Sequence, residues 1–132
     1  MGSIQPIKRI LVIDDDAATR DAIRKALAKP YPYEVVVAAG GREALTIIDR
    51  EQFDLVVCDI IMGEVDGLEV IRHIRECRSD LPIIVISGGG RIGPSDYLRI
   101  GIAFGAQKCM TKPLRVSELR DAVATLVGAE AH

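Results

Sequence analysis

The chain has 132 residues, of which 48% are hydrophobic and 27% charged, and its formal net charge is −2. A chain of this length is expected to form one domain that folds without disulfides or structural metals. Its charge predicts no bulk attraction to nucleic acid or to an anionic membrane, its apolar runs are too short to span a bilayer, and its amino terminus lacks the apolar core of a signal peptide. We therefore expect a cytoplasmic protein with no membrane partner and no direct nucleic-acid partner.

Apolar runs typical of strands alternate along the chain with segments of helical spacing. The first expected strand, residues 10–13, ends at three consecutive aspartates, and Asp15 or Asp16 is expected to cap the helix that follows. Ser117 is expected to cap the last helix, whose apolar residues recur every three or four positions. The expected strands are residues 10–13, 35–37, 55–58, 83–86 and 108–110, and the expected helices include residues 17–29, 44–48, 67–78, 95–104 and 119–127.

A glycine-rich segment follows the fourth expected strand. Gly88, Gly89 and Gly90 come directly after Ser87, and another glycine and a proline follow soon afterwards. Glycine runs lose much conformational entropy when they are ordered, so this segment predicts a mobile loop.

The three cysteines, Cys58, Cys77 and Cys109, are an odd number with wide spacing and no Cys-x-x-Cys pair. This pattern argues against a disulfide framework and against a zinc site. Each cysteine is expected to be a small buried hydrophobic residue.

Polar side chains follow four of the five expected strands at the point where each strand ends. They are Asp14, Asp59, Ser87 and Lys112 after the first, third, fourth and fifth strands, whereas the second strand ends in two alanines. If the polar ends meet, the first and third strands must be neighbours and the second must lie at an edge. We therefore predict an α/β flavodoxin-like fold of five βα units, a three-layer sandwich whose parallel five-stranded sheet has the order 2-1-3-4-5.

These polar groups together predict phosphoryl transfer. Asp14, Asp15 and Asp59 would repel one another unless a cation joined them, and three carboxylates without His or Cys favour Mg²⁺ or Mn²⁺. Beside such a metal, Asp59 can act as a nucleophile toward phosphorus. The Ser87 hydroxyl and the Lys112 ammonium can then contact phosphoryl oxygens and neutralise their charge.

Each of these features has an ordinary structural explanation when it is taken alone. An acidic run such as residues 14–16 is usually solvated or caps a helix, and an Asp after a strand is more often a turn residue than a nucleophile. A serine beside glycines and a lysine before a proline are common loop residues. The functional interpretation depends on all four lying at strand ends that a single topology brings together.

The sequence resembles the receiver domain of bacterial two-component response regulators over residues 8–127. The motifs that carry the resemblance are Ile-Leu-Val-Ile-Asp-Asp-Asp at 10–16, Asp-Leu-Val-Val-Cys-Asp-Ile-Ile-Met at 54–62 with Asp-Gly-Leu-Glu at 66–69, Ile-Ile-Val-Ile-Ser at 83–87, and Lys-Pro at 112–113. The resemblance implies a single receiver domain over residues 1–132. Because the last expected helix ends close to the end of the chain, we expect no output domain, in a protein that is either stand-alone or excised from a larger regulator.

The resemblance also implies a role for each residue of the site. Asp59 would be the phosphoacceptor, Asp15 a direct Mg²⁺ ligand and Asp14 a ligand through water. The backbone carbonyl of Ile61 would complete the metal shell.

Two further side chains would contact the phosphoryl group in this family. Ser87 would supply a hydroxyl and Lys112 its ammonium, and the peptide bond before Pro113 is expected to be cis. The donor of the phosphoryl group would be a phosphohistidine on a sensor histidine kinase or on a histidine phosphotransfer protein. Any catalysis would be limited to self-catalysed phosphotransfer and autodephosphorylation, so a conventional enzyme is not expected.

Four departures from the family pattern stand out. Gly63 replaces a usual proline, Gly88 replaces a usual alanine, the segment between the serine and the lysine is about three residues longer than is common, and Cys109 replaces the aromatic residue whose rotation reports phosphorylation. We hypothesise that ordering of the loop at residues 88–94 replaces this aromatic switch. Simple core filling is an equal alternative for Cys109.

An unknown downstream protein is expected to dock on the face formed by the fourth helix, the fifth strand and the fifth helix, and whether the chain forms a homodimer stays open. Basic residues make this face mildly positive, although solvated helix faces look the same. They are Arg91, Arg99, Lys108, Arg115 and Arg120.

Two other functional classes compete with the phosphoacceptor hypothesis. A phosphatase of the haloacid dehalogenase type would need a second Asp two residues after Asp59, where this chain has Ile61. An atypical receiver would act as a protein-interaction module that is never phosphorylated. Cys109 and the glycine loop leave this second alternative open.

Overall fold

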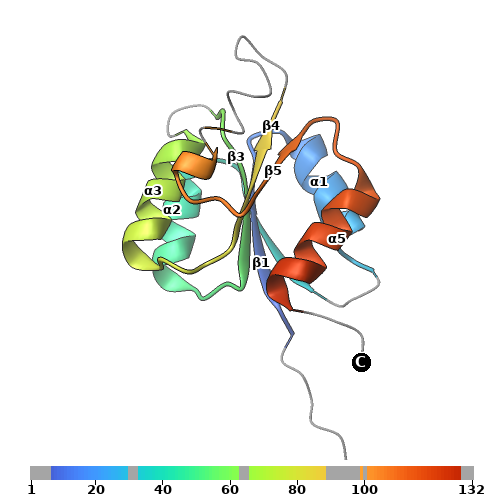
Figure 1. The fold of residues 1–132 in the computed structure, drawn as a ribbon, viewed down its shortest axis with the longest axis horizontal. Coiled ribbons are helices and arrows are strands. Elements are labelled where there is room, and N and C mark those ends of the chain that lie inside the picture. Colours follow the sequence, from blue (N-terminus) through green and yellow to red (C-terminus); the bar gives the residue numbers. More distant parts are fainter. Residues whose placement is uncertain (1–6, 30–32, 63–65, 89–98, 100, 129–132) are drawn as a thin grey trace, which may run out of the picture.

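A five-stranded parallel sheet forms the centre of the computed structural model, which describes residues 7–29, 33–62, 66–88, 99 and 101–128 (Figure 1). The strands lie in the order β2-β1-β3-β4-β5, and each neighbouring pair is parallel. In chain order they are β1 (Arg9–Ile13), β2 (Glu34–Ala38), β3 (Leu55–Asp59), β4 (Ile83–Ser87) and β5 (Lys108–Thr111). The flavodoxin-like fold and the strand order expected from the sequence are confirmed.

Helices cover both faces of the sheet, with α2 and α3 on one face and α1 and α5 on the other (Figure 1). Their bounds are α1 (Ala17–Ala26), α2 (Gly41–Arg50), α3 (Gly67–Cys77) and α5 (Val116–Val127). Of the fourth expected helix, Arg99 and residues 101–103 are helical, while residues 95–98 and 100 lie outside the described part of the chain. None of the helices that the structure describes has both the length and the apolar character needed to cross a membrane.

The core lies on both sides of the sheet because the side chains of a strand alternate between its two faces. In β1, Leu11 and Ile13 pack in the core on the side of α2 and α3, whereas Ile10 and Val12 pack in the core on the side of α1 and α5. All residues of β3 and β4 are buried. Their continuous apolar runs therefore reflect burial on two faces.

The helix starts agree only in part with the sequence analysis. Asp16 caps α1, since its side chain accepts a hydrogen bond from Ala18 N at 3.3 Å. The expected cap of the last helix is wrong: α5 has Arg115 at its N-cap, and Ser117 lies inside the first turn. Leu119 N donates to Arg115 O at 3.0 Å, so the helical hydrogen bonds already begin at Arg115.

The cysteines differ in burial. Cys58 is fully buried in β3 and Cys109 in β5 is partly buried, but Cys77 is exposed, so the prediction of a buried residue is wrong there. Cys77 lies in the last turn of α3, one turn after the partly buried His73, on an edge of the helix outside its buried stripe.

The start of α3 packs directly against the end of β3. Gly67 N donates a hydrogen bond to Ile60 O at 2.8 Å, and the Asp66 side chain caps the helix by accepting from Glu69 N at 3.0 Å. A Cβ atom added to Gly67 would lie only 2.0 Å from Asp59 O. Only glycine fits this junction, which positions the backbone that carries Asp59.

Candidate functional site

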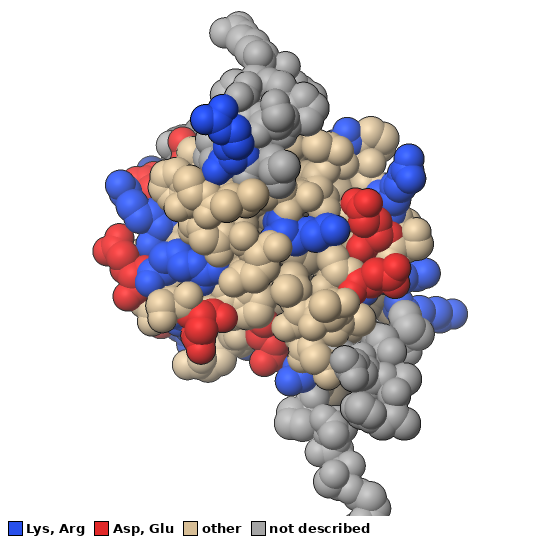
Figure 2. Space-filling model, viewed as in Figure 1, with Lys and Arg blue, Asp and Glu red and all other residues tan. Residues whose placement is uncertain are grey.

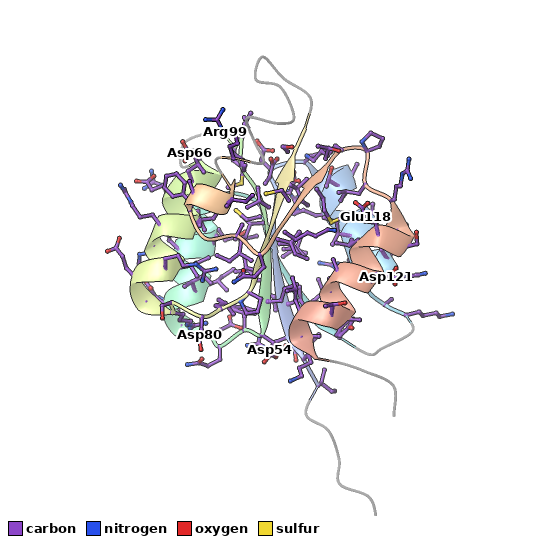
Figure 3. The ribbon with its side chains drawn as sticks, in the orientation of Figure 1. Asp54, Asp66, Asp80, Arg99, Glu118 and Asp121 are labelled. Atoms are coloured by element: carbon purple, nitrogen blue, oxygen red, sulfur yellow. The ribbon has the colours of Figure 1, made fainter. Side chains whose placement is uncertain are left out.

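The carboxyl ends of the parallel strands meet at one edge of the sheet, at the top of Figure 1. Asp14 follows β1, Asp59 and Ser87 are the last residues of β3 and β4, and Lys112 follows β5. Asp54, which precedes β3, lies at the opposite edge, near the bottom of Figure 3. All four side chains expected from the sequence therefore belong to the same edge.

Three carboxylates form the centre of this edge. Asp14, Asp15 and Asp59 each place an oxygen within 4.8 Å of the others. Asp14 and Asp59 are buried, with 0% and 4% of their surface exposed, whereas Asp15 is exposed. Buried carboxylates this close repel each other unless cations or hydrogen bonds compensate their charge.

Backbone contacts fix Asp14 in place. Its N–H donates to Ala38 O at 3.2 Å, which continues the pairing of β1 with β2, and its Oδ1 accepts from Asp16 N at 2.8 Å. Its Oδ2 is buried and accepts no hydrogen bond among the described residues.

Lys112 supplies the compensating charge. Its Nζ lies 3.1 Å from Asp14 Oδ2 as an ion pair and donates a hydrogen bond to Asp59 Oδ2 at 3.3 Å. Burial lowers the pKa of Lys112, but Asp14 and Asp59 together outweigh it, so the pKa is raised and the side chain stays an ammonium. Lys112 N also donates to Ser87 O at 2.8 Å, and the peptide bond between Lys112 and Pro113 is cis.

The Asp59 carboxylate is held at both oxygens. Oδ1 accepts from Ile61 N at 3.2 Å, and Oδ2 accepts from Lys112. Burial and the neighbouring Asp14 charge nevertheless raise the pKa of Asp59 above its ordinary value, with Lys112 and the Ile61 N–H opposing the shift. Lys112 therefore does not fully compensate the charge of the carboxylates.

The donor set fits a hard divalent cation. Three carboxylates offer oxygen ligands only, Asp14 Oδ2 accepts no hydrogen bond among the described residues, and Asp15 is exposed to water. Mg²⁺ or Mn²⁺ binds such oxygen sets and keeps several waters. Asp14, Asp15 and Asp59 would hold the ion; a contribution from the Ile61 carbonyl stays a prediction.

Magnesium is expected to stabilise the protein against unfolding, because the ion binds only the assembled carboxylates. At a concentration one hundred times the dissociation constant, the gain should be about 2.7 kcal/mol. Thermal unfolding with and without Mg²⁺ measures it. Asp15→Asn should remove most of the gain, whereas Asp121→Asn, which neutralises an exposed carboxylate on α5, should keep it; equal gains in both variants would contradict the assignment.

Ser87 is 4% exposed at the end of β4, where it pairs with Thr111 of β5. A Cβ atom added to the next residue, Gly88, would lie 3.4 Å from Lys112 Cδ, so this loop starts alongside the lysine side chain. Gly89 and Gly90, and most of the loop predicted to act as a switch, lie outside the described residues.

Cys109 packs against a glycine backbone. It pairs with Val85 in the sheet, and a Cβ atom added to Gly101 would lie 2.5 Å from Cys109 Sγ. Burial raises the pKa of this thiol. The close fit to Gly101 favours core filling for Cys109.

One residue that supports the site was missed in the sequence. Arg20 of α1 donates from Nη1 to Asp14 O at 2.8 Å and so holds the backbone of the aspartate from the neighbouring helix. No signal separates this arginine from other helix-surface arginines in the sequence.

Comparison with known proteins agrees with this geometry. A family model described as "Response regulator receiver domain" matches residues 10–124. The response regulator MprA of Mycolicibacterium vanbaalenii is 41% identical over 111 residues, which are 84% of this chain but 46% of the relative. The chain thus spans about half the length of the curated relatives it matches.

Solved structures give the same result. The response regulator protein TrrA of Thermotoga maritima, solved in complex with Mg²⁺-BeF, is 33% identical with a TM-score of 0.78, and the match covers 91% of this chain and 99% of that one. A putative response regulator from Chloroflexus aurantiacus is 27% identical with a TM-score of 0.84, covering 93% and 99%.

Proposed function

Since the chain belongs to the response regulator receiver domain family, we propose that Asp59 accepts a phosphoryl group from a phosphohistidine on a sensor histidine kinase or histidine phosphotransfer protein. The observation that supports this most is the shared contact of Lys112 Nζ with Asp14 and Asp59 at an edge where Asp15 completes an acidic cluster. A nucleophile, a cation and a set of metal ligands thereby converge at one point.

The transfer follows from the contacts of Asp59. A carboxylate oxygen forms the new O–P bond while the P–N bond of the phosphohistidine breaks, and the electron pair of that bond stays on the imidazole nitrogen. Lys112 faces Asp59 Oδ2 and would move onto the phosphoryl oxygens, and the Ser87 hydroxyl would donate to one of them. Mg²⁺, held by Asp14, Asp15, Asp59 and the Ile61 carbonyl, would neutralise phosphoryl charge.

The phosphorylated state would change binding to a downstream protein at the face that includes β5 and α5. A groove of about 400 Å³ lies there, lined in part by Lys108, Glu118 and Asp121. Figure 3 labels the two acids on α5, and Figure 2 shows basic and acidic side chains interspersed on the face it presents. The described residues of this face thus carry both signs of charge, while Arg91 lies outside them. Arg120 donates to Ala26 O at 2.6 Å.

Acetyl phosphate tests the proposal directly. In the presence of Mg²⁺ the intact mass of the protein should increase by one phosphoryl group, peptide mass spectrometry should locate that group on Asp59, and excess chelator should prevent the increase. A protein whose mass stays unchanged under these conditions would instead be the non-phosphorylated interaction module. Modification at another residue would also overturn the assignment of Asp59.

A further inference from the structure

A second group of metal-binding side chains lies between α2 and α3. His73 Nε2 is 2.8 Å from Asp49 Oδ1 and 3.8 Å from Cys77 Sγ, and the ligand atoms of all three residues lie within 4.8 Å of one another. The same ring nitrogen faces both the carboxylate and the thiol. Ligand atoms of three different types therefore lie close to one another.

The helices fix this arrangement. His73 and Cys77 are four residues apart on α3, so they lie on adjacent turns of one face. Asp49 is held opposite them because Ile48 of α2 and Ile74 of α3 pack in the same buried core.

A separate residue ties the ends of the two helices together. Arg78 Nη2, just after α3, donates to Ile48 O and Glu51 O at the end of α2, at 2.8 and 2.5 Å. The backbones on both sides of the cluster are thus anchored independently of its own side chains.

The cluster is accessible to a cation from solvent. Cys77 is exposed, and the Asp49 and His73 side chains are 57% and 33% exposed. An ion held by these three side chains would keep at least one position open to water, as three-ligand zinc sites do.

We propose that Asp49, His73 and Cys77 form a binding site for a borderline-soft divalent cation, with Zn²⁺ as the best fit. Tetrahedral Zn²⁺ with its usual bond lengths holds nitrogen, oxygen and sulfur ligands about 3.4–3.6 Å apart. The His73–Cys77 distance of 3.8 Å is already close to this spacing. The Asp49 carboxylate, on an exposed side chain, would have to move about 0.6 Å away from His73 Nε2, and by up to about 1.2 Å toward Cys77 Sγ. On binding, Cys77 Sγ loses its proton to water and bonds the metal, and His73 Nε2 bonds it through its lone pair, with the ring proton on Nδ1.

This site differs from the acidic edge in both chemistry and position. The edge offers carboxylates only, which select hard ions, whereas a thiolate and an imidazole select softer ones. Asp49 and Cys77 lie in the last turns of α2 and α3, and helices in such a sheet run opposite to the strands. The cluster therefore lies toward the opposite end of the sheet from the strand ends that carry Asp59.

Cobalt titration tests the proposal, because Co²⁺ substitutes for Zn²⁺ and reports thiolate ligation by a near-ultraviolet charge-transfer band. In the full chain with excess Mg²⁺, Co²⁺ should produce this band at one equivalent, and Zn²⁺ should bleach it. Cys77→Ser should abolish the band. His73→Gln and Asp49→Asn should weaken cobalt binding by more than about tenfold, since even changes outside the ligand shell have effects of that size.

Two control variants test whether the cobalt band comes from Cys77 or from another carboxylate or thiol of the chain. Glu76→Gln removes an exposed carboxylate next to Cys77, and Cys109→Ser removes the partly buried thiol; both should keep the band. Absence of a band in the full chain, or a band that survives Cys77→Ser, would overturn the proposal. Phosphoryl uptake should be the same in the Cys77→Ser variant, so the result is independent of the proposed function.

Discussion

Replacing Asp59 by Asn is expected to abolish phosphoryl uptake from acetyl phosphate and, in metal-free protein at neutral pH, to raise the free energy of unfolding. The loss of uptake follows because an amide oxygen is a poor nucleophile toward phosphorus. The gain in stability follows because burial and Asp14 raise the pKa of Asp59 in the folded state. A group with a raised folded pKa costs stability as pH rises through the interval above its ordinary value of 3.8, and that cost persists at neutral pH.

Chemical denaturation with chelator present measures the second effect, which should be about 1 kcal/mol, within the range of single stabilising substitutions. The difference between the two proteins should shrink below the ordinary pKa of 3.8, where Asp59 is protonated whether the chain is folded or unfolded. Asp121→Asn, at an exposed position on α5, serves as the control and should accept a phosphoryl group as fully as the unsubstituted protein does. If Asp59→Asn also accepts a phosphoryl group to the same extent, Asp59 is not the phosphoacceptor.

Replacing Gly67 by Ala should destabilise the fold by about 3 kcal/mol or more, an effect at the upper end for overpacking. The new Cβ would lie 2.0 Å from Asp59 O, 2.7 Å from Ile60 Cα and 2.9 Å from Asp59 C. All three are backbone atoms of the β3 end, so no side chain can rotate away. The helix must move, and the hydrogen bond from Gly67 N to Ile60 O would be strained.

Urea denaturation of the purified variant measures this loss, and phosphoryl uptake should fall as well because the clash displaces the backbone of Asp59. Gly40→Ala is the matched control. Gly40 also stands at the start of a helix, but its φ of −175° is open to any residue, and no atom of the described residues lies within 4 Å of an added Cβ. A loss in Gly67→Ala no larger than in Gly40→Ala would show that the junction tolerates a side chain.

The strand order could be predicted from the sequence because polar side chains that can bind metal and phosphoryl groups follow four of the strands. Asp14, Asp59, Ser87 and Lys112 can meet in a parallel sheet only if the second strand lies at an edge, and the structure has that order. Continuous apolar runs further marked β3 and β4 as strands buried on both faces. These features depend on local composition and on the topology of parallel sheets, which a single sequence reveals.

Other features depend on packing that the sequence does not encode locally. The start of α5 at Val116 rather than after Ser117 is marked by the hydrogen bond from Leu119 N to the Arg115 carbonyl. In the sequence, a serine in the first turn of a helix looks the same as a capping serine. The exposure of Cys77 follows from how α3 is rotated against α2. Likewise, the contact from Arg20 to the Asp14 carbonyl requires knowing how α1 lies beside β1.

The position of Lys112 between two buried aspartates has a consequence for the metal-free state of the site. The Lys112 ammonium acts as a built-in counter-ion that keeps the Asp14 and Asp59 carboxylates close together in the metal-free protein. The repulsion between the two acids is thus partly offset in the folded state, and the carboxylates are already close together when a divalent ion binds. If Asp59 is phosphorylated as proposed, the same lysine needs only to move from the carboxylates to the phosphoryl oxygens.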